Sequence, residues 1–370
     1  MPTEYFIKTN NLRRKALNNG DNFERDYNYD PLNLWNDAPV LDLNKEKRVF
    51  SRIGFGLASF SLVSLAVSLI IQLIVLFVNP DFASTSLFLN LVTPVSLYLF
   101  ALPVMLLIIG GLDAKAPEKR KMGFGQWLLI LLISFGLMYI GSFVGNYVMD
   151  IASAIAGYDY SNMLESVVDG ENLWVTAIFV VIVAPVGEEI VFRKLLIDRT
   201  QKYGCFISVM LSGLAFGLMH ANFYQFFYAF ALGLVLGYVY YNTGKLHLTI
   251  ALHATINFVG SIVSSWLTDS TEKMLEALET MDMSDPSASV NFLVEHGGAM
   301  AAMLLFEFFV FGAMICAIVL PIVLRRKINI GKGEIEIPRG RKFEVVVRNA
   351  GIIVMLAVYV FEFALNMLPI

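Results

Sequence analysis

Charged residues are scarce in this chain of 370 residues: only 16% are Asp, Glu, Lys or Arg, whereas soluble domains carry about a quarter. Hydrophobic residues make up 57%, and the mean hydropathy is +0.65. This composition excludes an ordinary soluble domain and predicts a protein that folds largely within lipid. The net charge of −4 argues against a nucleic-acid partner, because nucleic-acid binders concentrate Lys and Arg.

Cysteine is almost absent, and the N-terminus lacks an apolar stretch. Cys205 and Cys316 lie in apolar segments and form neither a disulfide framework nor a Cys-x-x-Cys metal motif, so we interpret them as packing residues. The polar residues 1–50 have no hydrophobic core of a cleavable signal peptide. We expect them to be a flexible cytoplasmic tail and the first spanning helix to direct membrane insertion.

Apolar stretches of the length needed to cross a bilayer, about 20 residues, recur along the rest of the chain. They predict an all-α, polytopic transmembrane helix bundle with about eight or nine spanning helices. The nine candidates are 54–78, 86–110, 125–149, 173–192, 203–221, 223–243, 246–267, 299–324 and 349–369. The chain has no convincing internal repeat, which gives no support to a transporter built from inverted repeats.

Basic residues alternate between the loops, and this alternation predicts the orientation in the membrane. Loops 79–85 and 150–172 have no Lys or Arg, and 268–298 has only Lys273 in an acidic context. The other loops are basic, through Lys45, Lys47, Arg48, Arg52, Lys115, Lys119, Arg120, Lys121, Arg193, Lys194, Arg199, Lys202, Lys245, Arg325, Arg326 and Lys327. We expect a multi-pass protein of the cell membrane with a cytoplasmic N-terminus and an external acidic loop at 268–298.

Two adjacent glutamates end the fourth candidate span. Glu189 and Arg193 are four residues apart, so they share a helix face and can form an ion pair. Glu188 is rotated by roughly 100° from Glu189, which leaves it free for chemistry, and Pro185 just before it is expected to kink the helix. The alternative is that both acids merely pair with Arg193 and Lys194 at the cytoplasmic end.

Histidine and asparagine also occur inside the spans, where polar side chains are costly and need a reason. His253 and Asn257 are one helical turn apart in the seventh span, and His220 ends the fifth. A His beside an Asn suits acyl chemistry, because both can donate to an oxyanion. Taken singly, each pattern is better explained by hydrogen bonds or packing that hold the bundle together.

The three patterns occur in order on successive spans: Glu-Glu-x-x-x-Arg, Phe-x-x-x-His and His-x-x-x-Asn. This ordered set resembles the CPBP family, the CAAX-processing and bacteriocin-processing proteases, also called the Abi family. The similar region covers about 125–267. The implied organisation is a tail (1–50), two N-terminal transmembrane helices (51–124), the intramembrane protease core (125–267), the external loop (268–298) and C-terminal transmembrane helices with a basic cytoplasmic loop (299–370).

The resemblance implies a glutamate-dependent intramembrane endopeptidase. Glu188 would be the base that activates water, and His220 would hold that water or the scissile carbonyl. His253 and Asn257 would stabilise the oxyanion, while Glu189 and Arg193 would form the structural pair. The substrate would be a membrane-associated peptide or protein, either lipidated or a bacteriocin or leader peptide, with membrane lipid around it.

Zinc held by Glu188, His220 and His253 is an alternative, since three protein ligands plus water form the usual catalytic site. The spacing does not match His-Glu-x-x-His, so we favour a mechanism without a metal or other cofactor. Two further alternatives are a non-proteolytic scaffold or immunity protein of the same fold and a proton-coupled transporter. A transporter would use Glu188 together with Glu307 and Glu362.

The depth of His220 poses a geometric problem. By helical rise, His253 lies about 10 Å from the cytoplasmic side and His220 roughly 25 Å. Straight, full-length spans would not bring His220 to Glu188. We expect that the fifth helix starts in the cytoplasm, that it tilts, or that the following turn lies inside the membrane on protein or a wet cavity.

The orientation leads to a first prediction. A cysteine introduced at Ser284 should react with a membrane-impermeant maleimide applied to intact cells, because the acidic loop is expected outside. Labelling that requires permeabilisation would reverse the assigned topology.

Overall fold

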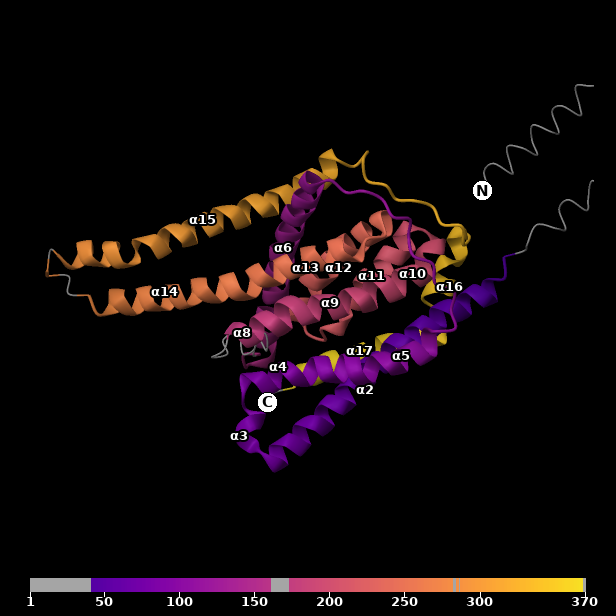
Figure 1. Ribbon diagram of the computed structural model, residues 1–370, viewed down its shortest axis with the longest axis horizontal. Coiled ribbons are helices and arrows are strands. Elements are labelled where there is room, and N and C mark those ends of the chain that lie inside the picture. Colours follow the sequence, from indigo (N-terminus) through magenta and orange to yellow (C-terminus); the bar gives the residue numbers. More distant parts are fainter. Residues whose placement is uncertain (1–40, 161–172, 282–283, 286, 369–370) are drawn as a thin grey trace, which may run out of the picture.

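The computed structural model describes residues 41–160, 173–281, 284–285 and 287–368, and these form an all-α bundle without strands (Figure 1). Most of the expected N-terminal tail therefore lies outside the described residues. The all-α, polytopic fold predicted from hydropathy is confirmed. The helices are α2 (Leu43–Val78), α3 (Pro80–Ala83), α4 (Ser86–Pro94), η2 (Val95–Ala101), α5 (Leu102–Ile109), α6 (Phe124–Ala156), α8 (Leu173–Thr176), η3 (Ala177–Val183), α9 (Ala184–Glu188), η4 (Glu189–Leu195), α10 (Leu196–Thr200), η5 (Gln201–Tyr203), α11 (Cys205–Met219), α12 (Phe223–Thr243), α13 (Leu246–Asn257), η6 (Phe258–Val263), α14 (Ser264–Glu279), α15 (Ala288–Val323), η7 (Arg339–Arg341), α16 (Lys342–Val346) and α17 (Ala350–Asn366).

The number of helices able to cross a membrane is smaller than the sequence predicts. Among the described residues six helices are long and apolar enough, and a seventh is added if Arg339–Val346 and Ala350–Asn366, bent by 60°, form one span. The candidate 203–221 forms the 15-residue α11, which is too short to cross alone. The candidate 173–192 is helical, but it consists of short α- and π-helical segments and is not among the six.

The segment expected as an external loop is mostly helical. Leu246–Glu279 runs as one span of 34 residues, and Ala288–Val323 adds another of 36. A helix of 36 residues is about 54 Å long, well beyond a hydrocarbon core of about 30 Å. Figure 1 accordingly shows α14 and α15 projecting together past the rest of the bundle.

Proline and π-helical turns interrupt the helices that surround the interior. Pro94 precedes η2, and Pro185 follows η3 directly, within the segment that carries the glutamate pair. Proline has no N–H and cannot complete the regular ladder, and π-turns occur frequently at functional sites. The kink expected at Pro185 thus takes the form of a change of helical type.

Close backbone approach joins α6 to α12. A Cβ atom placed on Gly141 would lie 2.5 Å from the Cα of Tyr228 and 2.6 Å from its backbone nitrogen. Small residues at helix interfaces permit such contact, which drives association within lipid. Because Tyr228 also lines the interior cavity, this contact positions part of the cavity wall.

This contact supports a second prediction. Gly141→Ala should destabilise the protein by about 1–3 kcal/mol, because the added methyl group meets backbone that cannot move aside. Gly125→Ala is the matched control on the same helix, since its Cβ would meet no described atom within 4 Å. The melting temperatures of the purified proteins measure both effects. Equal melting temperatures for the two variants would contradict the close packing of α6 and α12.

Candidate active site

A cavity of about 420 Å³ lies inside the bundle, between α4–η2, α6, η3–α9, α11–α12 and α13–η6. Its wall includes all four residues predicted to be catalytic: Glu188, His220, His253 and Asn257. Glu189 and Arg193 are fully buried beside it. The structure therefore brings the three motifs together and separates the two glutamates as the helical spacing predicts.

Glu189 and Arg193 form an ion pair with 3.1 Å between Arg193 Nε and Glu189 Oε2, and neither side chain is exposed. Among the described residues the guanidinium makes no aligned hydrogen bond. Its carbon instead lies 4.5 Å from the ring centroid of Phe216, an arrangement that gives cation–π attraction. The pair neutralises two charges that would be prohibitively costly alone in this interior.

His253 contacts both glutamates. Its Nδ1 lies 3.1 Å from Glu189 Oε1, a hydrogen bond, and its Nε2 lies 3.6 Å from Glu188 Oε2, which is longer than a hydrogen bond. A carboxylate only accepts, so we assign a hydrogen to Nδ1. A proton on Nε2 or on Glu188 then makes the second contact attractive. His253 is thus oriented by one acid and placed beside the other.

His220 caps the end of α11 and contributes a second imidazole. Its Nδ1 lies 2.9 Å from the carbonyl of Phe216, so Nδ1 donates and the neutral ring presents Nε2 as an acceptor. The Phe216 ring stands edge-on to both imidazoles, with centroids 5.2 Å from His220 and 5.5 Å from His253. The two histidines are therefore neighbours despite their different positions along their helices.

The turn after His220 explains how this is achieved. α11 ends at Met219, and Ala221 adopts a left-handed conformation (φ 53°), which costs an L-residue roughly 1–2 kcal/mol. The buried Ala221 accepts a hydrogen bond of 2.9 Å from Asn366 of α17, and Gln225 lines the cavity. The turn after His220 thus packs on protein and borders the cavity, as one of the arrangements expected for His220 requires.

Asn257 is anchored to the opposite wall. Its Nδ2 donates to the carbonyl of Val180 in η3 over 2.9 Å. Val180 lies five residues before Pro185, the spacing of a π-helical hydrogen bond that proline cannot donate. The amide thus uses one N–H on a carbonyl that the proline leaves available, and its second N–H remains for a ligand.

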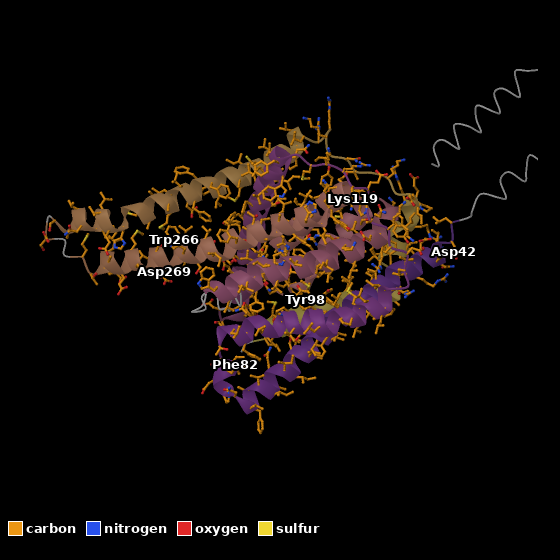
Figure 2. All side chains as sticks on the ribbon, viewed as in Figure 1. Asp42, Phe82, Tyr98, Lys119, Trp266 and Asp269 are labelled. Atoms are coloured by element: carbon orange, nitrogen blue, oxygen red, sulfur yellow. The ribbon has the colours of Figure 1, made fainter. Side chains whose placement is uncertain are left out.

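Tyr98 is a cavity residue that the sequence motifs do not reveal. It lies on η2, and its hydroxyl donates to the carbonyl of Ala184 over 3.4 Å. A Cβ on Gly187 would lie 2.1 Å from the Tyr98 ring, so glycine before Glu188 makes room for it. Figure 2 labels Tyr98 in the middle of the molecule. The available signal was Gly187 itself, but nothing in the sequence pairs it with a residue about 90 positions earlier.

The described residues contain no group of three or more His, Cys, Asp or Glu side chains that could hold a metal ion. Glu188, His220 and His253 line one cavity, but they do not form such a group. The acids of the transporter alternative lie elsewhere. Glu362 accepts hydrogen bonds of 2.5 and 2.7 Å from Ser61 between α17 and α2, and Glu307 is exposed on α15.

The geometry of the two glutamates gives a third prediction. Glu189→Gln should lower the free energy of unfolding by about 3–5 kcal/mol, because Arg193 would keep a buried charge without its counter-ion. Glu188→Gln should leave the melting temperature nearly unchanged, since the side chain of Glu188 is 14% exposed to the cavity. Similar melting temperatures for both variants would contradict this division of roles.

Comparison with known proteins gives one family match. Residues 170–259 match the family model described as type II CAAX prenyl endopeptidase Rce1-like. No curated protein and no solved structure shows significant similarity to the chain. The match includes all seven residues named in the three motifs, so the family resemblance predicted from those motifs is confirmed for this segment.

Proposed function

We propose that this protein is an intramembrane endopeptidase that hydrolyses a peptide bond with water activated by Glu188. The observation that carries the proposal is the convergence of Glu188, His220, His253 and Asn257 on one cavity of about 420 Å³. That volume falls within the range of small-molecule and peptide side-chain sites. The four groups converge at one end of the cavity, away from bulk water, and such exclusion strengthens the electrostatic interactions of catalytic groups.

Two acceptors are available to hold the attacking water. Glu188 carboxylate accepts one water hydrogen, and His220 Nε2 can accept the other, because His220 Nδ1 is already occupied by Phe216. Glu188 takes the first proton as the water oxygen bonds to the scissile carbonyl carbon. The resulting tetrahedral intermediate carries the negative charge on the former carbonyl oxygen.

His253 and Asn257 supply the donors for that oxyanion. The free N–H of Asn257 and a proton on His253 Nε2 are held in place by Val180 and Glu189 respectively, which is the preorganisation that oxyanion stabilisation needs. When the intermediate collapses, the C–N bond breaks and the proton held by Glu188 passes to the leaving nitrogen. Both water hydrogens and the oxygen are then accounted for in the acid and amine products.

The proposed setting is the cell membrane, with the N-terminus in the cytoplasm. The substrate is a membrane-associated peptide or protein, for which lipidated proteins and bacteriocin or leader peptides are the classes to test. A scaffold or immunity role would need the structural hydrogen bonds of His220, His253 and Asn257, but it would not require these groups to converge with Glu188 on one cavity. A transporter role gains no support from Glu307 or Glu362, since neither belongs to the cavity wall formed by the described residues.

Turnover of a peptide library by the purified protein tests the reaction and provides a fourth prediction. Glu188→Gln should abolish cleavage, and His220→Ala and His253→Ala should nearly abolish it. Asn257→Ala should lower kcat about a hundredfold or more with little change in KM, because one oxyanion donor is lost. Glu307→Gln, an exposed glutamate on α15, is the matched control and should cleave normally.

A strong chelator separates the two catalytic types. The proposed mechanism keeps its activity in chelator, whereas a zinc site would lose activity and regain it on addition of zinc. Cleavage that persists in Glu188→Gln would exclude a protease site at this position.

A further inference from the structure

The cavity extends from the catalytic residues in one direction only. Along the segment Leu173–Thr200 its wall contains Phe179, Val180, Ala184 and Glu188, and no described residue beyond Glu188. On the segment Leu246–Glu279 the wall begins at His253 and continues through Asn257 and Ser261 to Ser264. Because these two segments run antiparallel, with η3 beside η6 and η4 beside α13, both describe the same direction, and Glu188 and His253 lie at the closed end of the cavity.

Packed side chains close the opposite direction. Phe192, Arg193 and Leu196 have no exposed surface, and neither do Thr249 and Leu252 across from them. The Ser212 hydroxyl of α11 seals this layer by donating to the carbonyl of Phe192 over 2.7 Å. These packed residues close the site on this side, and the open end of the cavity is the approach to Glu188 that the described residues show.

The charges of the loops assign each direction to a side of the membrane. The open direction leads toward the start of α4 and the segment 79–85, which has no Lys or Arg. The packed layer leads toward Thr200, Lys202 and Lys245. Figure 2 shows Asp42 and Lys119 toward the right of the view and Phe82 to the lower left of them. Since basic loops stay in the cytoplasm, the cavity faces the extracytoplasmic side.

The outer wall of the cavity suits a hydrated polypeptide. Ser142, Ser264 and Asn90 contribute polar groups there, and Thr93 and Gly260 are exposed at its edge. A Cβ on Gly260 would meet no described atom within 4 Å. Polar groups at membrane depth are tolerated where they border water or bind a polar partner. A lining of hydroxyl and amide groups can hydrogen-bond the backbone of an extended peptide.

We propose that the site takes its substrate from the extracytoplasmic side. The substrate class is then a polypeptide whose scissile bond is presented from the outer half of the membrane, such as an exported or outward-facing membrane-anchored segment, and not a cytoplasmic tail. This inference rests on the proposed function for the cleavage itself, while the side of access depends only on the cavity and the topology.

Cysteine labelling tests the side of access without requiring turnover. In a background with Cys205 and Cys316 replaced by alanine, single cysteines are introduced at Ser264 and, as a second cavity position on another helix, at Ser142. Ser284→Cys and Ala116→Cys report the two membrane sides, and Ser212→Cys reports the packed layer. A small, membrane-impermeant maleimide-type or methanethiosulfonate reagent is applied to intact cells and to permeabilised cells.

The expected result is that Ser264→Cys and Ser142→Cys react in intact cells together with Ser284→Cys, whereas Ala116→Cys reacts only after permeabilisation and Ser212→Cys in neither case. Cavity cysteines that react only after permeabilisation, or in neither preparation, would overturn the proposal. Labelling as expected in a protein that cleaves no peptide would leave access intact and remove the protease assignment. Cleavage with labelling from the cytoplasmic side only would overturn the proposed side of access and leave the protease assignment intact.

Discussion

The buried ion pair of Glu189 and Arg193 is the interaction on which the site depends. Two charges without exposed surface persist in an apolar interior only if each compensates the other. The pair keeps Arg193 against Phe216, and the ring of Phe216 contacts both imidazoles. Glu189 also accepts from His253. This one carboxylate thereby contacts groups on η4, α11 and α13 around its neighbour Glu188, the proposed base.

Interruptions of the regular helices bring the other polar side chains of the site to the cavity. Pro185 withholds an N–H from the turn before it, and Asn257 donates to the Val180 carbonyl in that turn. Gly187 admits the ring of Tyr98, whose hydroxyl reaches Ala184 beside the same proline. The left-handed Ala221 turns the chain directly after His220. In each case a departure from the regular helix brings a polar group to the cavity, as is common where function opposes regular packing.

Local periodicity made part of the site predictable. The i, i+4 spacing of Glu189 and Arg193 separates them from Glu188 on any helix, whatever its surroundings, and the protein keeps that separation. Hydropathy likewise predicted the all-α membrane fold, but it overestimated the spans. Hydropathy measures the length of an apolar stretch. It does not show that the helix α11 ends after 15 residues or that the axes of α16 and α17 are bent by 60°.

By itself the sequence determined the membrane environment, the order of the three motifs and the different helix faces of the two glutamates, because composition and helical period are properties of short segments. Only the tertiary structure decided that His220 reaches the level of His253, that Tyr98 joins the wall, and that the cavity closes on the side of Arg193. Those features depend on contacts between helices distant along the chain. Side-chain volume and backbone turns select such contacts, and neither follows from the pattern of any one segment.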